Sequence, residues 1–272
     1  MKKTKLTFLG LLSSVLIFSC SKENVEVNES NNEETVQLIQ EISRAFIRDQ
    51  QAGFADREFR PSPEAISHDI HVGTDCLLSG LSFNDAVTFA MRASAHYGRL
   101  VPDLEEVELI GFELNPFDHF GIRHVELLHR QLTVDRDLTI DEDNTLNNEN
   151  YVPYILERLE EDYGVSSDEC PETTVENVEF YLEGLDDVSD YSLTNWISQR
   201  REEGLVNDQV FSILYSYFEA LENAATYEDF RIYSEEAETI VIDSRISESD
   251  KNIILFTMAT TRHDVYYWSV NS

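Results

Sequence analysis

Positive charge is scarce in this sequence. Lysine and arginine together number 20, against 53 aspartate and glutamate residues, so the formal net charge is −33 at pH 7. Five of the cations are lysines, and three of these, Lys2, Lys3 and Lys5, lie at the start of the chain. A field this negative repels nucleic acid phosphates and anionic lipid headgroups. We therefore expect no nucleic acid partner, and the charge favours cations or basic partners instead.

The sequence also lacks an apolar run long enough to cross a bilayer, which takes about 20 residues. The segment Leu6 to Phe18 is almost wholly apolar but shorter than that, and it directly follows the lysines at the start of the chain. A short apolar segment behind a positive one is typical of a secretory signal peptide. We therefore predict that residues 1–19 are a signal peptide.

Cysteine is rare, with three residues in the chain. Cys20 directly follows the predicted signal, and the residues Ile17, Phe18 and Ser19 before it resemble the lipobox of bacterial lipoproteins. This resemblance implies cleavage before Cys20, a thioether from its sulfur to diacylglycerol, and acylation of its amine. Two or more acyl chains hold a protein stably on a lipid bilayer. The implied location is the outer membrane, and the choice between its periplasmic and surface faces stays open.

Cys76 and Cys170 are the two remaining cysteines. An exported protein meets an oxidising compartment, which would permit one disulfide between them. Two unrelated buried thiols are the alternative, and the sequence does not decide between the two.

Large apolar residues are few directly after Cys20. The segment SKENVEVNESNNE is polar and acidic, so residues 20–33 are expected to form a lipidated cysteine on a flexible tether. Residues 34–272 contain enough apolar and aromatic side chains for a folded domain. A subdivision of this domain at the acidic loop 133–150 is left open.

Proline and glycine number only 6 and 10, so few positions interrupt regular helices. Apolar residues recur at helical spacing along most of the chain, as in the stripe Val210, Ile213, Leu214, Tyr217 and Leu221. The predicted fold class is all-α, as an irregular multi-helix bundle or a helical array. The segment 101–114 is ambiguous, and we favour a helix there over a short strand.

Several helix starts carry a cap signal, a serine or threonine three residues before an aspartate. The cap residues are Ser82, Thr226 and Ser247. The last helix contains an aromatic cluster, which we expect to be buried at the end of the bundle because aromatic side chains bury large areas. Its members are His263, Tyr266, Tyr267 and Trp268.

Acidic residues are concentrated in the stretch DRDLTIDEDNTLNNENY, residues 135–151. Its carboxylate and amide oxygens are the ligands that Ca²⁺ prefers. The candidate Ca²⁺ ligands are Asp135, Asp137, Asp141 and Asp143. An EF-hand loop does not fit, because Ile140 or Leu146 falls where that loop needs glycine. A solvated acidic loop is the favoured alternative.

Histidine and aspartate cluster in SHDIHVGTDC. His68, His71 and Asp75 carry donor atoms that Zn²⁺ accepts, so they form a candidate zinc site. Their spacing matches no known zinc motif, and roles in a loop or helix cap are the favoured alternative. No cofactor is predicted beyond these candidate Ca²⁺ and Zn²⁺ sites.

Three further histidines, His119, His124 and His129, recur every five residues. On a helix this spacing rotates the side chains by about 140° per step, so the three cannot share one face. We expect them on the outer face of an amphipathic helix.

Motifs for nucleophilic catalysis and nucleotide binding are missing, including Gly-x-Ser-x-Gly, the P-loop and the dinucleotide fingerprint. Capped helices that end in TMATTRHDVYYWSV, residues 257–270, together with the lipobox, resemble uncharacterised helical lipoproteins of Bacteroidota-type bacteria. That resemblance implies a cell-envelope location and a helical fold, and it supplies no site. The sequence favours a non-enzymatic binding or scaffold role with a protein, peptide or glycan ligand. An exported metal-assisted or carboxylate-based hydrolase is the alternative.

Overall fold

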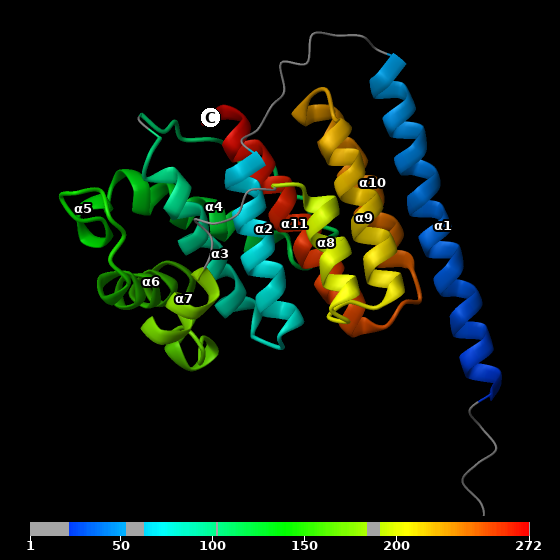
Figure 1. Cartoon of the computed structure of the whole chain (residues 1–272), viewed down its shortest axis with the longest axis horizontal. Helices are drawn as coiled ribbons and strands as arrows, with labels where there is room; N and C mark the ends of the chain where they lie inside the picture. The colour runs from blue at the N-terminus through cyan, green and yellow to red at the C-terminus, as the bar shows by residue number, and fades with distance from the viewer. Residues whose placement is uncertain (1–21, 53–62, 102, 184–190, 272) are drawn as a thin grey trace, which may run out of the picture.

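The structure is a computed structural model that describes residues 22–52, 63–101, 103–183 and 191–271 (Figure 1). Within these residues the protein is all-α, with eleven α-helices packed into a bundle and no β-strand, which confirms the predicted fold class. The helices are α1 (Lys22–Ala52), α2 (Pro63–Leu78), α3 (Phe83–Gly98), α4 (Asp118–Thr133), α5 (Arg136–Thr139), α6 (Asn148–Tyr163), α7 (Val175–Leu182), α8 (Leu193–Glu202), α9 (Asp208–Asn223), α10 (Tyr227–Asp243) and α11 (Glu248–Val270).

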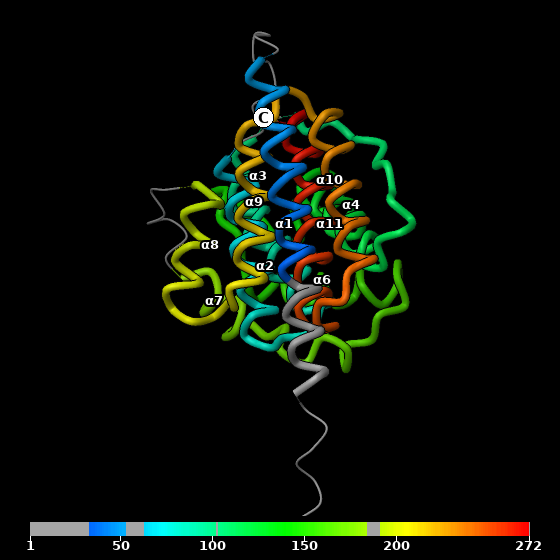
Figure 2. Tube along the Cα trace, turned by 90° about the vertical axis from the view of Figure 1, so that its right-hand side faces the viewer, coloured from blue at the N-terminus to red at the C-terminus, as the bar shows by residue number. Residues whose placement is uncertain are grey.

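The helices surround α11, which packs against α2, α4, α9 and α10. Figure 1 shows α1, α9 and α10 on one side of the molecule and α3 to α7 on the other, with α2, α8 and α11 between them. In the perpendicular view of Figure 2, α1 runs along α9 and α10. Because α11 touches helices on both sides, most of its side chains are buried.

Helix α1 begins at Lys22, so it includes most of the segment expected to be a flexible tether, residues 20–33. Neither proline nor glycine lies between Cys20 and Ala52, so no helix-breaking residue prevents α1 from extending on the N-terminal side of the buried Thr35 and Ile39. The signal peptide, residues 1–19, and the lipidated Cys20 lie outside the described residues. No helix within the described ranges combines the length and the apolar character that crossing a membrane requires.

The predicted helix caps are present. The side-chain oxygens of Ser82, Thr226 and Ser247 accept hydrogen bonds from backbone N–H groups three residues later, at 3.0, 3.0 and 3.1 Å respectively. Each cap satisfies a helix-terminal donor and is worth about 1 kcal/mol. These caps fix where α3, α10 and α11 begin, and therefore which of their faces meet the core.

The prediction of a helix at residues 101–114 is wrong, because the chain from Asp103 to Phe112 is irregular. Side chains from other elements satisfy its backbone in place of helical hydrogen bonds. Asn271 Nδ2 donates to the Glu105 carbonyl at 3.1 Å, and Asp118 Oδ2 accepts from the Phe112 N–H at 2.9 Å. These contacts, one of them from a residue 166 positions away, outweigh the weak local preference that the sequence carries.

Apolar side chains from both sides of the acidic loop 133–150 belong to one buried cluster. Of the predicted aromatic cluster near the C-terminus, His263, Tyr267 and Trp268 are fully buried, whereas Tyr266 is half-buried. Helices α4 and α11 approach most closely at Gly121, where an added Cβ would lie 2.8 Å from the Ala259 carbonyl oxygen and 2.6 Å from the His263 ring. A glycine there is what allows the two helices to cross so closely.

We expect Gly121→Ala to lower the free energy of unfolding by about 2 kcal/mol, because the new methyl group meets backbone that cannot move aside without separating two helices. Urea unfolding measures this change. Gly73→Ala in α2 is the matched control, since its Cβ would lie 3.1 Å from the Ala90 side chain. A larger loss at Gly73 than at Gly121 would contradict this account of the crossing.

Candidate metal centre

Three side chains from three helices meet in the centre of the protein. Asp69 comes from α2, His124 from α4 and Asp264 from α11, and all three are 0% exposed. Each offers a ligand atom within 4.8 Å of the other two, which is the one such group of three among the described residues. The site thus joins parts of the chain that are far apart in the sequence.

The distances within this triad fit metal ligands better than hydrogen-bond partners. His124 Nε2 lies 3.3 Å from Asp264 Oδ1 and 3.5 Å from Asp69 Oδ2. Good hydrogen bonds between nitrogen and oxygen are about 2.7–3.2 Å long, so both contacts are too long. Ligands bound at about 2.0–2.1 Å in a tetrahedral zinc site lie about 3.3 Å from one another.

Polar groups around the triad orient one ligand and leave others unpartnered. Ser94 Oγ and Trp268 Nε1 donate to Asp69 Oδ2, the latter at 3.4 Å. Asp69 Oδ1, both oxygens of Asp264 and both ring nitrogens of His124 have no hydrogen-bond partner among the described residues. Buried polar atoms without partners cost free energy, so a cation bound by one oxygen of each aspartate and one ring nitrogen of His124 would stabilise the site.

Electrostatics at the triad favour added positive charge. Burial lowers the pKa of His124, but the negative charges of Asp264 and Asp69, with a contribution from the Val87 backbone, outweigh burial and raise this pKa to about 9. Burial raises the pKa of Asp264 well above its ordinary value, with the Asp69 charge adding to it and His124 opposing it. Two carboxylates and a neutral imidazole would balance the charge of a divalent cation, which takes the place of protons at such sites.

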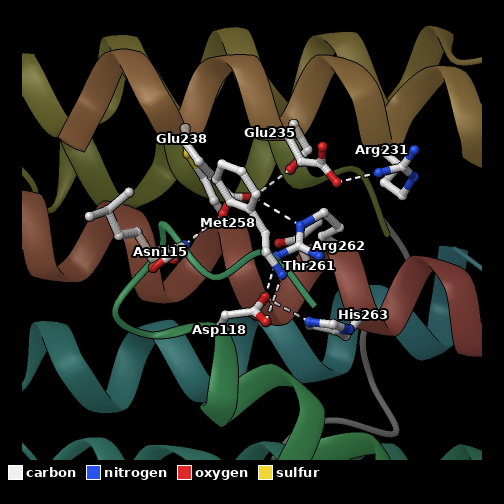
Figure 3. A network of polar contacts seen from close by, with 12 residues as sticks. Asn115, Asp118, Arg231, Glu235, Glu238, Met258, Thr261, Arg262 and His263 are labelled. Atoms are coloured by element: carbon white, nitrogen blue, oxygen red, sulfur yellow. Dashed lines mark hydrogen bonds and ion pairs between the residues drawn. The ribbon is translucent and has the colours of Figure 1, made fainter. Parts of the chain in front are cut away.

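A second polar network lies beside the triad on the same helix (Figure 3). Arg262 of α11 is fully buried between Glu238 of α10, whose Oε1 is 3.0 Å from its Nε, and Asp118 of α4, which it also contacts. His263 Nε2 lies 2.9 Å from the same Asp118 oxygen, Oδ1. Asn115 Nδ2 donates to Glu238 at 2.7 Å. Three successive residues of α11, 262 to 264, therefore connect α2, α4 and α10 through buried charge.

The predicted zinc ligands His68, His71 and Asp75 are not brought together. Asp75 makes a bidentate ion pair with Arg200, with both contacts at 2.7 Å. His71 stacks on Trp196 with ring centroids 4.7 Å apart, and the His68 ring lies 5.8 Å from that of Tyr191. The ion pair with Arg200 uses both oxygens of the Asp75 carboxylate, which a metal would need as ligands.

The acidic loop forms a tight turn rather than a group of converging carboxylates. The Asp141 N–H donates to the Thr145 carbonyl at 2.8 Å, and Asn144 has a left-handed backbone with φ of 65°. Asn144 is held by Arg136, whose Nη2 lies 2.6 Å from its side-chain oxygen. Of the four candidate Ca²⁺ ligands, Asp135 pairs with Arg130 at 2.8 Å. The other three, Asp137, Asp141 and Asp143, are exposed.

Cys76 and Cys170 are free, buried thiols, the second of the two alternatives that the sequence left open. Burial raises the pKa of both thiols, with the charge of Asp85 adding to the effect in each case, and that of Cys170 reaches about 12. Both are therefore protonated and unreactive at neutral pH.

Sequence reasoning came close to the triad without finding it. Asp69 lies between the predicted ligands His68 and His71, and Asp264 lies in the buried C-terminal cluster. The expectation that His124 lies on the outer face of its helix is wrong, because α4 is covered by α3 and α11. The prediction that the three histidines do not share one face is confirmed, since His119 is exposed, His129 is half-buried and His124 is buried.

Comparison with known proteins found no matching family model, no matching curated protein and no matching solved structure. The resemblance to envelope lipoproteins therefore stays a prediction.

We expect the protein to take up one Zn²⁺ per chain and to become more stable in its presence, because the cation satisfies the unpartnered atoms of the triad. Asp264→Asn should abolish both effects, since the amide keeps the shape of the carboxylate but not its charge. Elemental analysis after dialysis and thermal unfolding with and without Zn²⁺ measure the two effects.

Asp75→Asn is the matched control for this experiment. Asp75 belongs to the zinc site predicted from the sequence, but Arg200 occupies its carboxylate, so the variant should still bind one Zn²⁺ per chain. Loss of Zn²⁺ in Asp75→Asn with retention in Asp264→Asn would contradict the assignment of the site.

His71 makes the free energy of unfolding depend on pH. Burial, with added repulsion from His68 and Arg200, lowers the pKa of His71 to about 3, so below about pH 6.5 the unfolded chain binds a proton that the folded protein does not. Stability is therefore lost as the pH falls from about 6.5 towards 3. We expect His71→Phe, which keeps the stacking on Trp196, to reduce the loss between pH 7 and 4.5 by about 2 kcal/mol in urea unfolding. The exposed His119→Phe should change it less.

Proposed function

We propose that this chain is a lipid-anchored protein of the cell envelope with a non-enzymatic binding or scaffold role. The observation that carries the non-enzymatic part is the complete burial of Asp69, His124 and Asp264. A metal that catalyses hydrolysis needs an open coordination position that substrate and water can reach. A centre with no exposed ligand instead acts as a structural connection between helices.

The anchoring part of the proposal depends on the sequence. The lysines, the short apolar segment and the lipobox-like residues before Cys20 together favour export and acylation. The partner of Cys20 is then the lipid bilayer of the outer membrane. The strong negative charge favours a cationic group, or a protein, peptide or glycan with basic groups, as the ligand of the folded domain.

We expect the intact mass of the protein purified from its native membrane to match residues 20–272 plus acyl chains. Cys20→Ser should move the protein from the membrane fraction to the soluble fraction, because the thioether cannot form. Cys170→Ser is the matched control, since this buried thiol has no role in anchoring. A mass equal to residues 1–272 without lipid would overturn the anchoring proposal.

A further inference from the structure

A groove of about 650 Å³ lies between α3 and α7, in a size range typical of small-ligand sites. Helix α3 and its C-cap contribute Arg92, His96 and Arg99 to the lining. This grouping of basic side chains is unusual in a chain whose acidic residues outnumber its cations by more than two to one.

Arg92 carries a buried positive charge at this groove. It is 6% exposed, and its Nε donates to Asn148 Oδ1 at 2.7 Å. Within the described part of the chain, its two terminal nitrogens have no hydrogen bond and no carboxylate within 4.0 Å. Burial lowers the pKa of Arg92 to about 10, and repulsion from Arg99 adds to this, although Tyr151 opposes it. The Tyr151 ring, whose centroid lies 6.0 Å from the guanidinium carbon, does not neutralise this charge, so the side chain is suited to pair with an anion.

The other charged residues that line the groove are acidic. Helix α7 and its C-cap contribute Glu176, Glu179 and Glu183, all of which are exposed. Within the described residues none of the three forms an ion pair with Arg92, although all four side chains line the same groove. Phe180, which is 67% exposed, adds an apolar contact to the same groove.

The acidic side chains of the groove disfavour binding of a ligand that carries only negative charge. A ligand with negative charge alone would be repelled by the glutamates and by the net charge of −33. A ligand with negative charge at one end and positive charge at the other satisfies both sets of side chains and carries no net charge to be repelled.

We infer that the groove between α3 and α7 binds a short zwitterionic peptide, with its carboxylate on Arg92, its ammonium towards Glu176, Glu179 and Glu183, and an apolar side chain on Phe180. This inference rests on the proposed binding role and names the ligand class for it. The binding pocket is separate from the buried triad, which shares no residue with it.

The test is calorimetric titration of the mature, acylated protein in detergent with L-leucyl-L-leucine. We expect saturable binding of one dipeptide per chain. N-acetylation removes the ammonium of the dipeptide and C-amidation removes its carboxylate, and each change should weaken binding at least tenfold. These comparisons use the unaltered protein, so they do not depend on how any variant folds.

Two pairs of variants locate the site. Arg92→Gln should weaken dipeptide binding at least tenfold, whereas Arg245→Gln, which removes an exposed arginine elsewhere, should change it less than twofold. Glu179→Gln should weaken binding several-fold, and Glu236→Gln, on the exposed face of α10, should have no effect.

Each other outcome overturns the inference. Equal binding of the N-acetylated dipeptide, or binding of acetate alone with the same affinity, would identify a site for simple anions. Equal loss in Arg245→Gln would identify a general effect of charge. If the protein stays in the membrane fraction but binds no dipeptide, the ligand class is wrong and the anchoring proposal stands.

Discussion

The buried charge of Arg262 is the interaction on which the rest of the structure depends. This guanidinium is fully buried and lies between Glu238 and Asp118, so α10 and α4 are both tied to α11. Removing one partner of such a buried pair costs about 3–5 kcal/mol, because the other charge is left uncompensated. The contacts of Arg262 with Glu238 and Asp118 require α11 to keep its observed register. The ion pairs select one register of that helix, and this register places Asp264 beside His124 and Asp69.

The two buried polar clusters share this dependence on α11. In the triad, unpartnered oxygens and nitrogens lie at distances that suit a cation, whereas the Arg262 network supplies its own positive charge. The groove at Arg92 is a third case, in which a buried arginine lacks a carboxylate partner among the described residues and is open to a ligand. The charge of Arg262 is therefore compensated by carboxylates of the protein itself. The charge of the triad would be compensated by a metal ion, and that of Arg92 by a bound ligand.

The sequence was sufficient for the features that depend on local spacing. The helical periodicity and the caps at Ser82, Thr226 and Ser247 gave the fold class and several helix starts correctly. It was insufficient where distant segments decide the outcome. Residues 101–114 are irregular because Asn271 and Asp118 hold their backbone, and the triad unites residues separated by up to 195 positions. No local pattern distinguishes the inward His124 from its exposed neighbour His119, because both occur on the same helix.

The position of α11 has a consequence for the order of assembly. Among the described residues this helix follows ten others along the chain and yet contacts α2, α4, α9 and α10, so the packing of these four helices against it cannot form until residues 248–270 are available. Until then the buried carboxylates of Asp118 and Glu238 lack the positive charge of Arg262, and burying them is penalised. The core is therefore completed only when almost the whole chain is available, because its central helix is the last one in the sequence.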